Sequence, residues 1–207
     1  MRERPILMSA PMVRALLAGT KTQTRRVCKP AANLSAVVAC QDPATYREGQ
    51  RPPYITPGWF GDEEGDVQFF CSYGAPGDRL WVREAWARDD EDGALFYRAD
   101  VGSCNEADDW ERNRLDGVAR YRWRPSIHMP RAASRITLEI TGVRVERLQD
   151  ISRGDAMAEG CPFPNMAHGA DPRAWFADLW QEINGPGSWG ADPWVWVIEF
   201  QTRRGTA

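Results

Sequence analysis

The sequence has no long hydrophobic run and no regular arrangement of cysteines. No uninterrupted apolar stretch of the 207-residue chain exceeds five residues, whereas a membrane-spanning helix needs about 20. We therefore expect neither a transmembrane segment nor a secretory signal. The five cysteines are scattered and include no C-x-x-C pair, which argues against a disulfide framework and a zinc ribbon. These absences predict a cytoplasmic protein with no membrane partner.

Histidine and the common catalytic motifs are also scarce. The two histidines, His128 and His168, argue against a histidine-based triad and a three-histidine metal site. A Walker loop and the motifs G-x-G-x-x-G, H-E-x-x-H and G-x-S-x-G are all absent, and with them the usual signs of phosphate, dinucleotide, zinc-protease and α/β-hydrolase chemistry. We expect neither a metal nor a cofactor.

Lysine is the scarcest charged residue. Of the 26 basic residues only Lys21 and Lys29 are lysines. An ammonium group can lose its proton at accessible pH, whereas a guanidinium cannot, so Lys21 merits separate attention. The formal net charge is −3, which excludes general coating of nucleic acid by bulk electrostatics. Residues 117–138 nevertheless contain five arginines and no acid, and this stretch is either an anion-binding face or ordinary solvated surface.

The hydrophobic periodicity predicts an α+β fold, a small mixed β-barrel with short peripheral helices. Helices are expected after Pro11 and up to Gly19, over residues 151–160 with a capping-box spacing from Ser152 to Asp155, and from 172 to 184. Strands are expected at 6–8, 22–27, 67–71, 79–86, 94–98, 134–148 with a bend at Gly142, and 193–201. Residues 29–65 lack periodicity and read as a long loop insertion. One domain over 1–207 follows.

One short motif carries a family resemblance. Residues 17–26 read LAGTKTQTRR, and this resembles the G-x-K-x-x-T-x-R signature of the ASCH domain, a PUA-like β-barrel family tied to RNA and nucleoside recognition. Residues 76–82, 155–160 and 194–200 resemble further family segments in the same order. The resemblance covers about half of the chain, so that residues 29–65 and 88–120 become insertions, and the long form is similar to ASCH proteins of bacterial prophages.

The resemblance implies three catalytic residues. In one small bacterial branch of the family, the matching lysine, threonine and helix glutamate remove the acetyl group from N(4)-acetylcytidine; here they are Lys21, Thr24 and Glu159. A neutral Lys21 amine would take the proton of the Thr24 hydroxyl, Thr24 would attack the acyl carbon, and Glu159 would orient Lys21. The structural alternative is a salt bridge between Lys21 and Glu159 that closes the barrel.

A second group of residues is expected to bind the ligand, which the resemblance gives as a nucleoside, a nucleotide or RNA. A strip of tryptophan, hydroxyl and guanidinium groups suits a base and its phosphate. The candidates are Arg26, Glu84, Trp86, Trp123, Ser126, His128, Arg131 and Arg135. The alternative is that the aromatic residues are core and the arginines are solvated. Two other functions stay open: a non-catalytic RNA or modified-base binding module, and a ribonuclease of the same fold.

Overall fold

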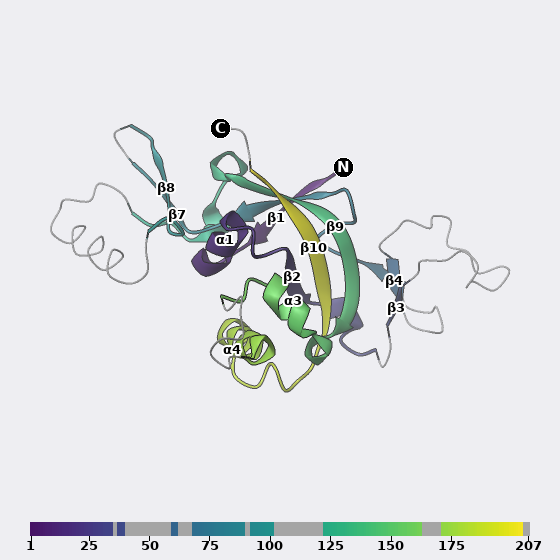
Figure 1. Ribbon diagram of the computed structural model, residues 1–207. Coiled ribbons are helices and arrows are strands. Elements are labelled where there is room, and N and C mark those ends of the chain that lie inside the picture. The colour runs from purple at the N-terminus through teal and green to yellow at the C-terminus, as the bar shows by residue number, and fades with distance from the viewer. Residues whose placement is uncertain are drawn as a thin grey trace.

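A five-stranded sheet forms the centre of the molecule (Figure 1). The computed structural model describes residues 1–34, 37–39, 59–61, 68–89, 92–101, 122–162 and 171–204. The strands follow the order β1-β6-β9-β10-β2, and only the β1–β6 pair is parallel. Their bounds are β1 Glu3–Leu7, β6 Arg79–Arg83, β9 Ile136–Arg147, β10 Trp194–Arg204 and β2 Gln23–Val27.

Strands β9 and β10 are the longest and give the sheet its curvature (Figure 1). Their register shifts between Glu199 and Phe200, opposite Gly142. The predicted bend at Gly142 is therefore confirmed, within one continuous strand. A Cβ on Gly142 would lie 2.7 Å from a carboxylate oxygen of Glu199, whose flexible side chain would then have to shift.

Among the described residues three α-helices accompany the sheet, as predicted. They are α1 (Ala10–Leu17), α3 (Arg153–Ala158) and α4 (Pro172–Asn184). The capping box of α3 is confirmed, because the Ser152 hydroxyl accepts from the Asp155 N–H at 3.0 Å and Asp155 accepts from the Ser152 N–H at 3.2 Å. Asp171 caps α4 by a single bond, accepting from the Arg173 N–H at 3.1 Å. Single 3-10 turns lie at η1 (Lys29–Ala31), η3 (Ser126–His128), η4 (Arg131–Ala133) and η5 (Leu148–Asp150).

Two small sheets extend from opposite sides of the central sheet (Figure 1). Part of the expected insertion 29–65 forms strands rather than loop: β3 (Val38–Ala39) and β4 (Trp59–Gly61) pair with β5 (Gln68–Phe70). The rest of residues 35–67 lies outside the described residues, as does 102–120 of the second insertion. The single strand expected at 79–86 was wrong in extent, because β7 (Trp86–Arg88) leaves β6 and pairs with β8 (Leu95–Tyr97) in a separate hairpin.

The two faces of the sheet bury separate cores, and β10 contributes to both. Trp196, Ile198 and Phe200 pack against α1 and the β3-β4-β5 sheet, while the alternate residues Val195 and Val197 pack against α3 and α4. Period-2 alternation along a strand produces this division. The directly paired residues of β2 follow it, so that successive β2 side chains belong to opposite faces.

The expected closed β-barrel is not formed by the described strands. Their hydrogen-bonded order is linear, with β1 and β2 as the two edges. The two edges are joined by a side chain instead: Arg26 of β2 donates to the Leu7 carbonyl of β1 at 2.8 Å. The fold is therefore mixed α+β, mostly sheet with a few short helices. In the ranges that the structure describes, no helix is long and apolar enough to cross a membrane.

Candidate functional site

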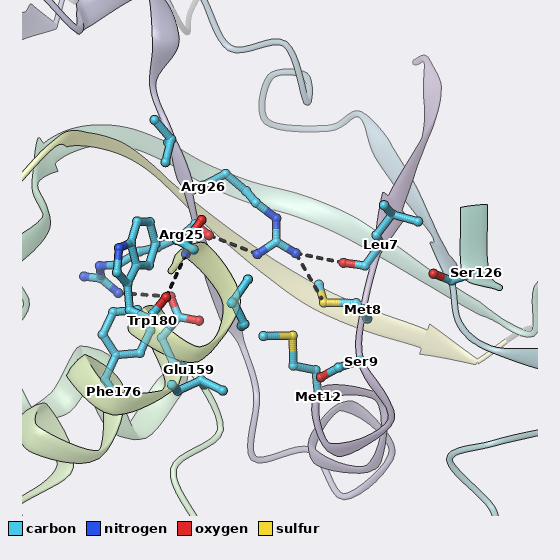
Figure 2. Close-up of a pocket in the computed structure, with 14 residues that line it drawn as sticks. Leu7, Met8, Ser9, Met12, Arg25, Arg26, Ser126, Glu159, Phe176 and Trp180 are labelled. Carbon is cyan, nitrogen blue, oxygen red and sulfur yellow. Dashed lines mark hydrogen bonds and ion pairs between the residues drawn. The ribbon is translucent and has the colours of Figure 1, made fainter. Parts of the chain in front are cut away.

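A cleft lies where the sheet stays open between β1 and β2. Its first part, about 410 Å³, is lined by the end of β1, by β2 and by α4 (Figure 2). Its second part, about 510 Å³, runs between α1 and α4. The two parts share Ser9, Met12, Glu159 and Leu179, so they form one continuous cleft with Glu159 at the junction.

Glu159 is a buried carboxylate that is held between two cations. It is 4% exposed and follows α3 as its C-terminal cap. One carboxylate oxygen accepts from Lys21 Nζ at 2.7 Å, and the other accepts from Arg25 at 3.2 Å. An ionised carboxylate has about four lone-pair sites, so these two contacts leave acceptor capacity that a ligand in the cleft can use.

Lys21 lies behind Glu159, away from the cleft lining. It is 1% exposed and pairs with Glu159 through an isolated β-bridge. Its ammonium donates to the Glu159 carboxylate and, at 2.8 Å, to the Glu159 carbonyl oxygen. Burial lowers the pKa of Lys21, against the opposing charge and hydrogen bond of Glu159. The contact expected between Lys21 and Glu159 is confirmed; the catalytic role of Lys21 stays a prediction.

Arg25 connects this pair to a wider charge network on the same face of the sheet. Its guanidinium contacts Glu146 and lies 3.6 Å from Asp155 as well as bonding Glu159. Burial would raise the pKa of Asp155, but hydrogen bonds from Ser152 and Gln23 and the Arg25 charge outweigh it and lower this pKa to about 2. The network therefore surrounds a fully buried guanidinium with three carboxylates, those of Glu146, Asp155 and Glu159.

Thr24 is placed on the opposite face of β2 from Arg25. It pairs with Ile198, a residue of the α1-side core, whereas Arg25 pairs with Val197 of the other core. Thr24 is fully buried, and its hydroxyl has no hydrogen-bond partner among the described residues. The structure thus brings Lys21 to Glu159 but does not join Lys21 to Thr24 by a hydrogen bond. Neither of these two side chains lines the cleft.

Arg26 crosses the mouth of the cleft. Figure 2 shows its guanidinium reaching from β2 to the Leu7 carbonyl and the Met8 sulfur, which lie 2.8 and 3.7 Å away. A further bond of 3.0 Å to the Arg25 carbonyl fixes the same group. Arg26 was predicted as a binding residue, and the structure places it at the cleft.

Two N–H donors in the cleft lining have no partner among the described residues. They are the Nε of Arg25 and the indole nitrogen of Trp180, and both atoms are buried. Buried polar groups in folded proteins are nearly always hydrogen-bonded, so these two donors would bond an acceptor of a ligand once a side-chain shift opens them to the cleft. Phe176 and Trp180 form an aromatic wall beside them, with ring centroids 6.1 Å apart (Figure 2).

The sequence reasoning missed Arg25, Phe176 and Trp180 as cleft residues. The aromatic pair follows helical spacing on α4 and was read as core, which is correct for most of its surface because both residues are about 95% buried. Arg25 was overlooked beside Arg26 of the motif. Strand alternation is the signal that could have separated them, since neighbouring residues of β2 face opposite cores.

Two of the predicted binding residues form a structural clasp far from an open site. Arg135 makes a bidentate contact with buried Glu84 at 2.9 and 3.1 Å and a second one with Asp100 at 2.7 and 2.8 Å. Burial raises the pKa of Glu84, and Arg135 opposes this shift. The guanidinium also stacks 3.9 Å from the Tyr97 ring centroid. This clasp fastens the β7–β8 hairpin to the central sheet.

The other predicted binding residues are dispersed. Trp86 is buried in a small core with Met129 and Ala133, and Arg131 pairs with Glu3 at 3.1 Å on the surface. Ser126 lines the cleft. Trp123 and His128 line a different pocket next to the hairpin. The structure thus brings only Arg26, Ser126 and Glu159 of the predicted residues to the cleft.

Comparison with known proteins adds no further assignment. No family model, no curated protein and no solved structure matches this chain. In the described part of the chain, no group of three histidine, cysteine, aspartate or glutamate side chains is placed to hold a metal ion. The geometry of the cleft and the motif that lies beside it are therefore the features that indicate a function.

Proposed function

We propose that this chain is an ASCH-type protein that binds the base of a nucleoside or nucleotide in the cleft between α1 and α4. The observation that carries the proposal is that one lining contains the Glu159 carboxylate, an acceptor, together with two side chains that each hold a buried donor with no partner among the described residues, Arg25 Nε and Trp180 Nε1. The edge of a cytosine offers an amine donor beside carbonyl and ring-nitrogen acceptors, which is the complementary set.

The walls of the cleft suit a flat heterocycle. Phe176 and Trp180 contribute aromatic groups to the lining, and because both are about 95% buried a base would contact only the small exposed part of each ring. The volumes of about 410 and 510 Å³ lie within the range of small-molecule sites. Because Glu159 lies at the junction of the two parts of the cleft, a substituent on the cytosine amine would have room to extend along α1.

Deacylation of an N(4)-acylated cytidine is the second candidate activity. Two observations favour it: the lowered pKa of Lys21, which moves the amine towards the form of a base, and the Thr24 hydroxyl, which has no partner among the described residues. In this reaction Lys21 takes the Thr24 proton, the hydroxyl oxygen attacks the acyl carbon, the cytosine amine leaves with a proton, and water hydrolyses the acyl ester. The hydroxyl must first become accessible from the cleft and come within hydrogen-bond reach of Lys21, which it does not contact in the described structure.

Binding and turnover are tested together. Cytidine and N(4)-acetylcytidine are added to the purified protein, the binding constant is measured by calorimetry, and the product is followed by mass. Trp180→Phe keeps the aromatic wall but removes one donor, so we expect binding about tenfold weaker. Phe176→Leu is a second test variant, which keeps the donor but removes one ring of the aromatic wall, so its loss of binding measures the contribution of that ring alone. Equal binding of all three proteins, or no binding by the wild type, would refute the site.

The catalytic candidate has its own readout. Thr24→Val removes the hydroxyl without changing the volume of the buried side chain. If the protein is an amidohydrolase, this variant binds N(4)-acetylcytidine as the wild type does and releases no cytidine. Binding without turnover in the wild type would establish a recognition protein and leave Lys21 and Thr24 with structural roles only.

A further inference from the structure

A second pocket, built almost entirely from cationic and aromatic side chains, lies beside the β7–β8 hairpin. Its volume is about 480 Å³. The lining residues are Arg88, Arg122, Trp123, Arg124, Pro125 and His128, and none of them is acidic. This pocket shares no lining residue with either part of the cleft.

The backbone around this pocket is anchored before any ligand arrives. Arg124 and Trp86 exchange two backbone hydrogen bonds of 2.7 and 3.2 Å, which tie the segment to β7. The Arg124 guanidinium also lies 5.1 Å from the Trp86 ring centroid. At the other end, Arg83 donates to the Met129 carbonyl at 3.0 Å. The backbone that carries Arg124 is therefore anchored at this pocket, which lowers the entropic cost of binding an anion there.

The charge of this pocket is opposite to that of the whole chain. Three arginines line one pocket in a protein of formal net charge −3. Guanidinium groups match phosphate oxygens in a bidentate geometry, and the neighbouring indole and proline offer surfaces on which a base can stack. A double helix would need basic residues over a wider surface to contact its phosphates, whereas a single strand can place successive phosphates and a splayed base in one small pocket.

We propose that this pocket binds the phosphodiester backbone of a single-stranded nucleic acid through Arg88, Arg122 and Arg124. The inference goes beyond the proposed function, because it would stand even if the cleft bound nothing. The 3-10 turn η3 connects the two sites: Ser126, at its start, lines the cleft, and His128, at its end, lines the pocket. A nucleic-acid strand whose phosphates occupy the pocket therefore lies next to the cleft. The pocket thus favours an oligonucleotide over a free nucleoside as the ligand.

The salt dependence of binding tests this proposal quantitatively. A labelled oligouridylate or oligothymidylate of ten nucleotides is titrated with the full chain, and Kd is measured by fluorescence anisotropy from 20 to 200 mM salt. For single strands the slope of log K against log salt is about −0.7 per phosphate contact. Three contacts predict a slope of about −2, and Arg122→Ala with Arg124→Ala predicts about −0.7. The affinity of this double variant at 20 mM salt should fall more than tenfold.

A charge-matched control separates the pocket from general electrostatics. Arg2→Ala with Arg153→Ala removes two exposed arginines elsewhere on the surface and should leave the slope at about −2. Melting curves of both double variants establish that they fold. The proposal is overturned if the wild type does not bind the oligonucleotides at 20 mM salt, if the two double variants behave alike, or if a duplex of the same length binds as tightly as the single strand.

Discussion

Glu159→Gln is the most informative single change in the buried network. It removes the carboxylate charge and leaves the Lys21 ammonium, which has no exposed side-chain surface, facing a neutral amide. Arg25 keeps Glu146 and Asp155. Removing one partner of a buried ion pair destabilises a protein by about 3–5 kcal/mol. Lysine can limit this loss by giving up its proton, which at pH 7 costs about 4.6 kcal/mol from a reference pKa near 10.4.

Because the cost of deprotonating Lys21 changes with pH, the destabilisation caused by Glu159→Gln also depends on pH. If Lys21 is neutral in the folded variant and protonated in the unfolded chain, the unfolded state binds more protons, and stability rises with pH by about 1.4 kcal/mol per unit up to the unfolded pKa. The cost of deprotonating Lys21, which is the upper bound on the loss of stability, falls to about 1.9 kcal/mol at pH 9. We expect Glu159→Gln to lose about 4 kcal/mol at pH 7, a fall in Tm on the order of 10 °C, and to regain about half of that loss at pH 9.

Urea unfolding followed by tryptophan fluorescence at pH 7, 8 and 9 measures both quantities. Glu146→Gln is the matched control, because it also removes one carboxylate from Arg25 but leaves no lysine unpaired; arginine does not release its proton, so its smaller loss of about 1 kcal/mol should not change with pH. A pH-independent loss in Glu159→Gln, or an equal pH dependence in both variants, would refute the reasoning.

Three further predictions concern residues around the same network. The pKa of Asp155 is lowered to about 2 in the folded state, so its contribution to stability is complete above about pH 4 and is lost as the pH falls towards 2. Asp155→Asn should therefore cost about 2 kcal/mol at pH 7 and make stability less dependent on pH in acid. An unchanged dependence of stability on pH in acid would contradict this. Gly160→Ala places a Cβ 2.9 Å from the Ala15 Cβ at a φ of +97° and should lower the free energy of unfolding by about 2–3 kcal/mol. Gly187→Ala is the control, because Gly187 has a φ of +80° but open space around it, and it should lose less. Equal losses would rule out the steric clash. Thr24→Val removes a buried hydroxyl that has no partner in the described ranges and should leave Tm unchanged or raise it by a few degrees, whereas a loss of several degrees would reveal a hydrogen bond to the hydroxyl.

Local signals in the sequence predicted the elements better than their assembly. The Ser152–Asp155 spacing and the Asp171-Pro172 start identified α3 and α4 because a cap depends on neighbouring residues only. The bend at Gly142 was predictable for the same reason. The break after Arg83 was not, since the alternating pattern continues to Trp86 and the partner that turns β7 away, Arg124, is distant in sequence.

The site was predictable only in part. The motif and the helix glutamate correctly indicated that Lys21 and Glu159 belong together. Arg25 contacts Glu146 and Glu159, which are more than 120 residues away in the sequence. A short sequence motif cannot predict contacts between residues so far apart. The open seam between β1 and β2 depends on pairing that strand propensity does not specify, because propensity describes single strands and not their order in a sheet.

The central position of β10 has a consequence for synthesis of the chain. β10 is the last described strand in sequence, yet it hydrogen-bonds to β9 on one side and to β2 on the other. A ribosome adds roughly 5–20 residues per second, so β2 waits for its neighbour until β10, more than 160 residues later in the sequence, has emerged. During that interval the segment with Lys21 and Arg25 has no sheet to join. We therefore expect the cleft to be completed late, and nascent chains that end before β10 to require chaperone protection.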